Sequence, residues 1–381
     1  MKPFKRNDFP TLGIEEELHL IDQETAELTP TVNEVMALLE PDFRERVCYE
    51  LLQCVLETRT GVYETVDELL RETSNGRTIL ADCCSKLNVN IVAAGSHPFS
   101  DWKKQPFVDS EHYQWVRNNC RYIAHRMLSF GLHIHVGVKN AEAAIYIMNE
   151  MRRWAYPLLA LSANSPYYDG VDTGLVSTRA HLFHSMPRTK FAPPFKSFAE
   201  LIDFYEKFLA AGDIRQPGDL WWIIRPQPPL GTVEFRIFDI PTSVRRIGAF
   251  AALIQAAVDT YQDRFFAGIP ISSLNEGYLE ENWWKAIRYG INTDMIEPET
   301  GEIISISDQL KRLIGLTVPK AKELHAEHHI NFAEKMIEQG SEAKIQRALC
   351  KKLNGDLRAL EKELAVKTVD FSGQNYQAKY E

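Results

Sequence analysis

The sequence lacks the features of secreted, membrane-spanning and disulfide-stabilised proteins. No apolar run approaches the roughly 20 residues needed to cross a bilayer, and no apolar segment of the kind found in signal peptides follows the charged first residues. Only six cysteines occur among 381 residues, and none forms a C-x-x-C pair, which is typical of reduced cytosolic thiols. We therefore expect a cytoplasmic protein with no membrane partner.

The chain has fewer basic residues than acidic ones. Lys and Arg number 43 against 52 Asp and Glu, which gives a formal net charge of −9, and the sequence pI is near 5.7. A mildly acidic surface repels phosphate backbones, so nucleic acid is not expected as a partner. Hydrophobic residues make up 45% and charged residues 25% of the chain, which is the profile of a folded globular protein. From these proportions and the sparse cysteines we expect a soluble, intracellular enzyme.

Apolar segments bounded by Pro, Gly or charged turns predict six strands: 11–21, 47–58, 90–95, 131–138, 221–224 and 232–238. Helical spacing of apolar residues predicts four helices in the first half of the chain: 31–39, 66–87, 110–127 and 141–161. Residues 163–194 are rich in Gly, Pro, Asn and Ser, which predicts a long loop, and such loops are often functional.

The chain contains no internal repeat and no linker, so we predict one α+β domain over residues 1–381. Its core spans about 10–365, a helical part begins near residue 243, and a polar tail over 370–381 is expected to be frayed. An apolar stripe marks the last predicted helix: Ile345, Leu349, Leu353, Leu357, Leu360 and Leu364. This stripe could pack on its own chain or mediate a homodimer contact.

Three consecutive glutamates, Glu15 to Glu17, begin the first predicted strand, where glutamate is normally depleted. The two-residue period of a strand places Glu15, Glu17 and His19 on one face. Two same-face carboxylates about 6–7 Å apart can hold a hard divalent cation, although an acidic face could also be merely solvated.

A second acidic pair, Glu50 and Glu57, lies in the segment predicted as strand 47–58. Seven residues is an odd interval, so an ideal strand would point the two side chains in opposite directions. Either a bulge restores a common face or only one of the two faces a site. A solvated strand margin is the plainer alternative.

The segment 131–138 places His133 and His135 on one strand face, and two imidazoles on one face need partners. An H-x-H pair can belong to a zinc site, but no third His or Cys ligand stands at a recognisable spacing. A site for Mg²⁺ or Mn²⁺ built from histidine and carboxylate fits this chain better.

Glu234 and Arg236 share a face of strand 232–238 in the same way. Arg179, in the long loop, and Arg225, before a Pro-rich turn, add positive charge that suits phosphate or carboxylate oxygens. Three strands therefore carry functional groups at alternate positions, as E-x-E, H-x-H and E-x-R. Neither a G-x-x-x-x-G-K-[ST] motif nor a kinase glycine loop is present, so metal ions and arginines would have to hold the phosphates of a nucleoside triphosphate.

The motifs that carry a family resemblance occur in order along the chain: Gly13-Ile-Glu-Glu-Glu, Gly95-Ser-His-Pro-Phe, Gly131-Leu-His-Ile-His-Val-Gly, Ala160-Leu-Ser-Ala-Asn-Ser-Pro, Asp172-Thr-Gly with Ser177 and Arg179, Gly231-Thr-Val-Glu-Phe-Arg, and Arg288-Tyr-Gly. Over about residues 10–365 the chain resembles the glutamate–cysteine ligase type 2 family of carboxylate–amine ligases. The resemblance implies a fold like the catalytic domain of glutamine synthetase. In that fold a curved, mainly antiparallel six-stranded sheet holds ATP and metals on its concave face, and helices pack outside.

The resemblance also implies a reaction. ATP phosphorylates a carboxylate, typically the γ-carboxyl of glutamate, and an amine, typically that of cysteine, then displaces phosphate to form an amide. A ligase using another amine is the nearest alternative. A phosphotransferase acting on a guanidino group would need a reactive cysteine beside acidic residues, which no cysteine here has. A non-catalytic binding protein and a zinc hydrolase are the remaining alternatives.

The family's site residues carry over by motif position. The implied ligands of Mg²⁺ or Mn²⁺ are Glu15, Glu17, Glu50, Glu57, His133 and Glu234. Arg236 is implied to neutralise the transferred phosphoryl group, with Glu57 as the second catalytic residue and ATP as co-substrate. His135 would line the nucleotide side, and Arg179 and Arg225 would bind substrate carboxylate or phosphate.

The chain departs from the family at three places. Ile223 replaces an acid in Trp-Asp-x-Arg-Pro, His112 replaces Arg in Glu-Arg-Tyr, and Arg188-Thr-Lys190 stands where a Gly-containing turn is usual. The metal-bearing strands are intact, so the chemistry is expected to persist. These three places are candidates for a changed amine pocket.

Overall fold

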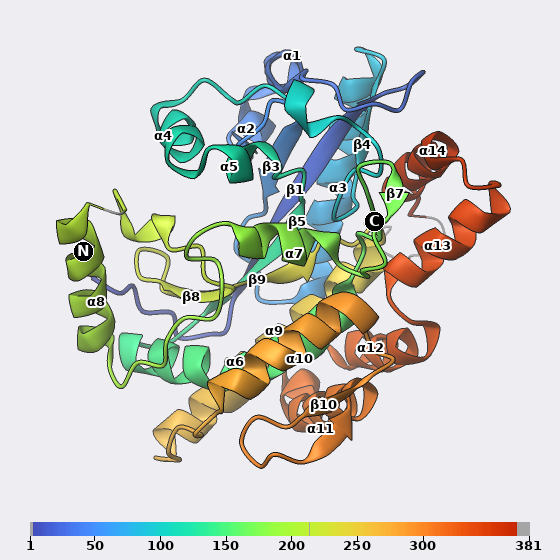
Figure 1. The fold of residues 1–381 in the computed structure, drawn as a ribbon. Helices are drawn as coiled ribbons and strands as arrows, with labels where there is room; N and C mark the ends of the chain where they lie inside the picture. Colours follow the sequence, from blue (N-terminus) through green and yellow to red (C-terminus); the bar gives the residue numbers. More distant parts are fainter. Residues whose placement is uncertain (1–2, 213, 372–381) are drawn as a thin grey trace, which may run out of the picture.

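The structure is a computed structural model that describes residues 3–212 and 214–371. A seven-stranded sheet runs through its centre in the order β2-β3-β1-β5-β9-β8, with β4 paired to β1 as well (Figure 1). Every pairing in this sheet is antiparallel. Its strands are β1 Leu12–Asp22, β2 Val47–Tyr49, β3 Val55–Arg59, β4 Val89–Val92, β5 Gly131–Gly137, β8 Ile224–Gln227 and β9 Thr232–Asp239.

Helices make up most of the rest of the chain. In the first two thirds they are α1 Val32–Leu38, α2 Pro41–Arg44, α3 Val66–Ser85, α4 Glu111–Cys120, α5 Tyr122–His125, α6 Ala141–Ser162, α7 Thr178–Ser185 and α8 Phe198–Ala211. The later helices are α9 Val244–Phe266, α10 Glu276–Tyr289, α11 Ile306–Glu323, α12 Glu327–Gln339, α13 Glu342–Lys352 and α14 Leu357–Thr368. Two small hairpins, β6 Tyr167–Tyr168 with β7 Val171–Asp172 and β10 Asp294–Ile296 with β11 Ile303–Ser305, complete the fold.

The predicted fold class, an α+β fold with a mainly antiparallel open sheet, is confirmed. The sheet has seven strands rather than six because the chain leaves the predicted strand 47–58 after Tyr49 and re-enters the sheet at Val55. Strand β8, at the edge of the sheet, lies at Ile224–Gln227, a few residues later than the predicted strand 221–224. It includes Pro226 because β8 is an edge strand, where a missing backbone donor is tolerated.

Two predicted helices are broken, and left-handed residues mark each break. The helix predicted over 110–127 divides at Arg121, whose φ is +46°. The predicted terminal helix divides into α13 and α14 at Asn354 and Gly355, with φ values of +56° and +81°. The segment predicted as a long loop contains the β6–β7 hairpin and α7. Residues 372–381 of the predicted polar tail lie outside the described part of the chain.

Alternation along the strands separates the two faces of the sheet. Positions such as Leu12, Ile14, Ile134, Val233 and Phe235 are fully or almost fully buried in one core with α6 and α9. The intervening positions point to the opposite face, where the predicted site residues lie. One face is therefore closed by helices, and the other is free to carry polar chemistry.

Glu16 is a charged residue on the helix-covered face, and Arg77 of α3 neutralises it. Arg77 Nη2 lies 2.7 Å from Glu16 Oε1, and its other N–H groups donate to the carbonyls of Pro241, Thr242 and Thr368. Both side chains are almost wholly buried. Because this one cation bonds groups from three other segments of the chain, it fixes α3 and the end of α14 against the sheet.

Most of the apolar stripe of the last predicted helix packs on its own chain, but Ile345 is exposed. Leu360 and Leu364 lie buried in a core with β1, β3 and β4, and α14 packs against β4. Within the described residues, no helix is long and apolar enough to cross a membrane.

Candidate active site

The register of the sheet collects the predicted site residues on one face. Glu15 lies opposite His133, and Glu17 lies opposite Glu57. His135 lies opposite Glu234 on the next strand. Side chains directly opposite each other in antiparallel strands are about 5 Å apart, so residues as distant in the chain as Glu15 and His133 become neighbours.

An irregularity in the β5–β9 pairing adjusts the position of Arg236. Leu132 pairs with Phe238 and Ile134 with Phe235, so two residues of β9 face the single residue His133. A bulge of this kind bends the strand and re-aims its side chains. Arg236 Nη1 consequently lies 3.2 Å from His133 Nδ1.

Glu50 reaches the site from the turn between β2 and β3. The odd interval between Glu50 and Glu57 required either a bulge or an outward-facing side chain, and the structure resolves it by breaking the strand. Glu50 Oε2 accepts a hydrogen bond of 2.5 Å from the N–H of Leu51. Both glutamates line the same cavity.

Three groups of possible ligand atoms lie within 4.8 Å of one another on this face: Glu15, Glu57 and His133; Glu17, Glu50 and Glu57; and Glu15, His135 and Glu234. Burial and the negative charge of Glu17 raise the pKa of Glu50 to about 7. Burial and the charges of the other three glutamates raise the pKa of Glu57 well above its ordinary value. Close carboxylates repel each other, and protons or bound cations relieve that repulsion.

Two histidines hold Glu15 in its ionised form. His133 Nδ1 lies 2.9 Å from Glu15 Oε2, and His135 Nε2 lies 3.6 Å from Glu15 Oε1. Burial acts to raise the pKa of Glu15, but the hydrogen bond to His133 and the charge of the nearby His135 outweigh it and keep that pKa below its ordinary value. The Nε2 atoms of both histidines are buried and have no hydrogen-bond partner. Buried polar atoms are normally paired, so these nitrogens indicate a ligand-binding site.

Glu234 is surrounded by donors. Arg225 Nε lies 2.6 Å from Glu234 Oε2, Arg236 Nη1 lies 2.6 Å from Glu234 Oε1, and Gln227 donates as well. Burial acts to raise the pKa of Glu234, but the two arginines keep it well below its ordinary value. Glu234 is therefore a permanent anion that fixes both guanidinium groups.

The two arginines differ in the donors they leave free. Arg225 also donates to the carbonyls of Gly218 and Leu220, so much of its guanidinium is already bound by the protein. Arg236 lines the cavity, and its Nε is buried without a partner. Arg236 is thus the better placed of the two to contact a ligand.

Arg179 of α7 approaches the sheet over Gly131. Its guanidinium lies 3.3 Å from the carbonyl oxygen of Arg236, and a Cβ at Gly131 would come within 2.1 Å of Nη2. Any larger residue at 131 would displace this cation. The N–H of Gly131 also donates to Glu17 Oε2 at 2.5 Å. This one glycine therefore helps to position both the carboxylate of Glu17 and the guanidinium of Arg179.

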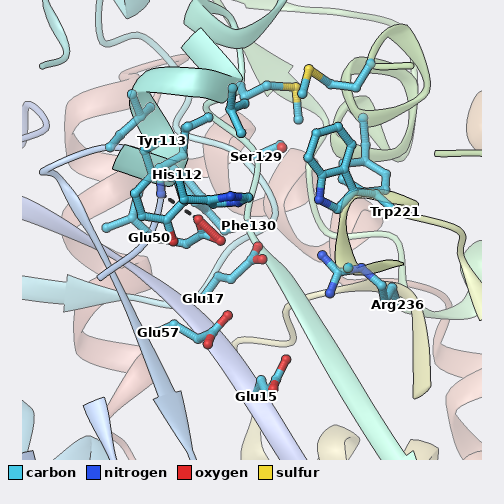
Figure 2. Close-up of a pocket in the computed structure, with 18 of the residues that line it drawn as sticks. Glu15, Glu17, Glu50, Glu57, His112, Tyr113, Ser129, Phe130, Trp221 and Arg236 are labelled. Carbon is cyan, nitrogen blue, oxygen red and sulfur yellow. Dashed lines mark hydrogen bonds between the residues drawn. The ribbon is translucent and has the colours of Figure 1, made fainter. Parts of the chain in front are cut away.

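These side chains surround a cavity of about 340 Å³, a size suited to a small molecule. Figure 2 shows the glutamates on one side of it, Arg236 and Trp221 on the other, and His112 and Tyr113 above them. The rest of the wall is largely apolar: Leu51, Leu52, Val55, Val116, Met127, Phe130, Phe183 and Met186. His133, His135 and Glu234 are absent from this lining. His133 lies against Glu15, and His135 lies against Thr232 and Glu15.

The three departures from the family pattern have different surroundings. His112 lines the cavity, and its Nδ1 lies 4.0 Å from the buried Oδ1 of Asp219. Ile223 is buried in the apolar core. Arg188 lies over the ring of Trp221, and Lys190 forms an exposed ion pair with Glu280. Only His112 therefore faces the cavity directly.

Several cavity residues carried no sequence signal. Trp221, Phe183 and Met186 have the composition of an ordinary core, and only the turn of the chain around Arg225 and α7 brings them to the site. Asp239 was also missed. It is fully buried and accepts hydrogen bonds from the hydroxyls of Ser165 and Ser177, which anchors the segment that carries Arg179.

The donor set fits hard divalent cations. Carboxylate oxygens predominate, with one imidazole nitrogen in each of two groups, and no cysteine belongs to any group found among the described residues. Oxygen-rich sites suit Mg²⁺ and Mn²⁺, whereas thiolate-rich tetrahedral sites suit zinc. Cations bound here would offset the charge of four glutamates and would orient phosphate oxygens.

We expect the stabilisation of the protein by Mg²⁺ to increase with pH between about 6 and 8. Protons compete with the metal for Glu50, whose pKa is about 7, and one pH unit below that value the competition costs about tenfold in affinity. Thermal unfolding with excess Mg²⁺ and with EDTA, compared at each pH, isolates this effect from the titration of buried histidines. A Glu50→Gln variant should show a flatter dependence, and an equal slope in both proteins would contradict the assignment.

Comparisons with known proteins identify the family of the chain. The sequence pattern of the family described as Glutamate-cysteine ligase family 2 matches residues 11–363. A glutamate–cysteine ligase of Haloferax volcanii is 37% identical over 298 residues, which cover 78% of this chain and 83% of that one.

Solved structures show the same fold at low identity. The glutamate–cysteine ligase of Francisella tularensis, crystallised with AMP, has a TM-score of 0.72 at 13% identity, and the match covers 97% of this chain and 91% of that one. A bifunctional glutathione synthetase of Pasteurella multocida has a TM-score of 0.70 at 12% identity, over 94% of this chain and 52% of that one. The chain belongs to glutamate-cysteine ligase family 2, and it is an ATP-dependent carboxylate–amine ligase.

Proposed function

We propose that the protein joins the γ-carboxyl group of glutamate to an amine, with cysteine as the first candidate, through an acyl phosphate and with Mg²⁺ or Mn²⁺ as cofactor. The observation that carries the proposal is a single cavity with four carboxylates on one side and the guanidinium of Arg236 on the other. The relatives named above as glutamate–cysteine ligases support the choice of substrates.

The carboxylate side suits the nucleotide. Glu15, Glu17, Glu50, Glu57 and His133 would hold the divalent ions, which supply charge neutralisation for the phosphates of ATP. Glu234 would contribute mainly by fixing Arg225 and Arg236, since both guanidinium groups already occupy its oxygens.

The arginine side suits the transferred phosphoryl group. A carboxylate oxygen of the substrate attacks the γ-phosphorus, the bond to ADP breaks, and the amine then displaces phosphate from the acyl carbon. Arg236 lines the cavity where the negative charge would grow, and a fixed donor helps most at that moment. The apolar part of the wall would limit access of water to the acyl phosphate.

The upper part of the cavity would accept the amine. Here the wall offers apolar side chains together with His112 and Tyr113, and His112 stands where the family pattern has arginine. A histidine side chain is shorter than that of arginine and lacks the fixed charge of the guanidinium. If cysteine proves inactive as the amine, we propose that His112 selects an amine of different charge or size from the family's usual substrate.

A guanidino phosphotransferase is disfavoured by the state of the cysteines. All six are free, and five are buried. Cys48 is the half-buried one and lies opposite Glu57 in the β2–β3 register, so the prediction that no cysteine lies beside an acidic residue was wrong. Burial raises its pKa above the ordinary value, so it lacks the thiolate that such a reaction needs.

We expect a Cys48→Ala variant to retain most of the activity, because no cysteine serves as nucleophile. A combined replacement of all six by serine would bury five hydroxyls and confound activity with folding, so the single alanine variant is the sharper test. Steady-state ADP release measures it. Complete inactivation with an unchanged melting temperature would favour the guanidino reaction.

ADP release with Mg-ATP, glutamate and a panel of amines tests the proposed function. The panel should include cysteine, other amino acids of graded size, and simple primary amines. We expect ADP release that requires both glutamate and an amine, with the amide identified by mass spectrometry. Release that requires no amine, or an amide formed with a carboxylate other than glutamate, would contradict the proposal.

A further inference from the structure

We propose that Asp67, His328 and His329 form a second metal site, which takes a borderline divalent ion such as Zn²⁺. Asp67 lies in the first turn of α3, and the two histidines lie in the first turn of α12. His328 Nε2 and His329 Nε2 lie 3.2 Å and 3.0 Å from the same atom, Asp67 Oδ1. All three ligand atoms lie within 4.8 Å of one another.

The site is separate from the candidate active site. Helix α3 packs on the face of the sheet to which Glu16 points, and α3 and α12 both pack against α9. The carboxylates of the active site occupy the opposite face. The sheet therefore stands between the two clusters, and they share no residue.

The spacing of the three donors matches shared coordination. With metal–nitrogen and metal–oxygen distances of about 2.0–2.2 Å, neighbouring ligands of a tetrahedral ion lie roughly 3.3 Å apart. The observed separations of 3.0 and 3.2 Å need little adjustment to accept an ion. Adjacent residues of a helix usually diverge by about 100°, yet these two rings converge, with centroids 3.9 Å apart.

The protein holds His329 in place. His329 is 2% exposed, and its ring lies against Gly248 of α9, where a Cβ would come within 3.0 Å of Nδ1. An imidazole held in one position by its surroundings is preorganised to bind a metal.

The other two donors leave room for a water ligand. The side chains of His328 and Asp67 are 59% and 52% exposed, so the remaining coordination position would face solvent. Two imidazoles and one carboxylate are ligands that suit zinc better than magnesium. The nearby Arg245 and the two helix N-termini oppose a cation, so Asp67 must supply the compensating charge.

A metal at this site would act as a clip between α3 and α12, which are more than 240 residues apart in the chain. An ion bound only by the folded protein raises its stability by mass action. We therefore expect Zn²⁺ to raise the melting temperature through this site.

Zinc binding is best measured by competition with a chromophoric chelator, in excess Mg²⁺ so that the carboxylates of the active site are occupied. We expect the wild-type protein to bind one more Zn²⁺ than the His328→Ala and Asp67→Asn variants do, or to bind it at least tenfold to a hundredfold more tightly, since even outer-shell partners contribute about that much. Both changed side chains are half-exposed, so folding should survive.

His325→Asn is the matched control, because His325 is an exposed histidine close to the site, and its φ of +56° suits asparagine. The control should bind zinc as the wild type does, and zinc should raise its melting temperature equally. Unchanged zinc binding in His328→Ala, or an equal loss in His325→Asn, would overturn the proposal.

Discussion

Replacing Glu57 by glutamine is expected to lower turnover by at least about a thousandfold while the protein stays folded. Glu57 belongs to two of the three ligand groups in the active site, so one change removes a charge from both. Loss of a single transition-state contact costs about a hundredfold to a thousandfold, and loss of a metal ligand shared by two groups should cost no less. An amide keeps the shape of the side chain but not its charge.

The same change has a second consequence that a structural role would not produce. Burial and three neighbouring glutamates raise the pKa of Glu57 well above its ordinary value, so its ionised form opposes folding above that pKa. The stability contributed by a carboxyl group with a raised pKa is present at low pH and is lost as pH rises through the folded-state pKa. In EDTA at pH 8, Glu57→Gln should therefore melt at the same temperature as the wild type or higher.

Glu45→Gln is the control for this pair of measurements, because Glu45 is an exposed glutamate near the same edge of the sheet. It should leave both turnover and melting temperature unchanged. Full turnover of a folded Glu57→Gln protein with saturating Mg-ATP would refute its place in the metal site.

Replacing Arg236 by lysine is expected to lower kcat by about a hundredfold or more with little change in KM for ATP. Lysine keeps the charge of arginine but loses its planar fork of donors. In that fork, Nη1 of Arg236 contacts Glu234, and Nε is buried without a hydrogen-bond partner. A donor that acts on charge developing in the transition state affects kcat rather than ground-state binding. Arg44→Lys, a change at an exposed arginine, is the control.

Steady-state kinetics with varied ATP separate the two possible roles of Arg236. A large rise in KM with unchanged kcat would mean that Arg236 binds ATP uniformly and has no special role in phosphoryl transfer. Because Arg236 also contacts Glu234, the melting temperature of the Arg236→Lys variant should be measured as well. An unchanged value shows that the loss of kcat does not come from unfolding.

Alternation along strands was the part of the sequence that predicted the site best. The spacing of Glu15 with Glu17, His133 with His135, and Glu234 with Arg236 placed each pair on one face, and the structure has all three on the same face. Periodicity within a strand is a local property, so it can be read without knowledge of the fold.

Features that depend on breaks in local structure were harder to predict. Glu50 joins the site only because the chain leaves the sheet after Tyr49, and Pro226 lies in β8 only because that strand is at an edge. The adjacent pair His328 and His329 gave no signal, since its partner Asp67 lies 261 residues from His328. The contact of Arg225 with substrate carboxylate or phosphate stays a prediction. Its guanidinium already donates to the carbonyls of Gly218 and Leu220, and the sequence could not predict these tertiary contacts.

Transfer of an oxygen isotope tests the proposed acyl phosphate most directly. Glutamate labelled with ¹⁸O in its γ-carboxyl group is incubated with Mg-ATP and the active amine, and the phosphate is analysed by ³¹P NMR. Attack of the carboxylate on the γ-phosphorus predicts ADP and phosphate that carries one labelled oxygen. Unlabelled phosphate, or AMP and pyrophosphate in place of ADP, would contradict the mechanism.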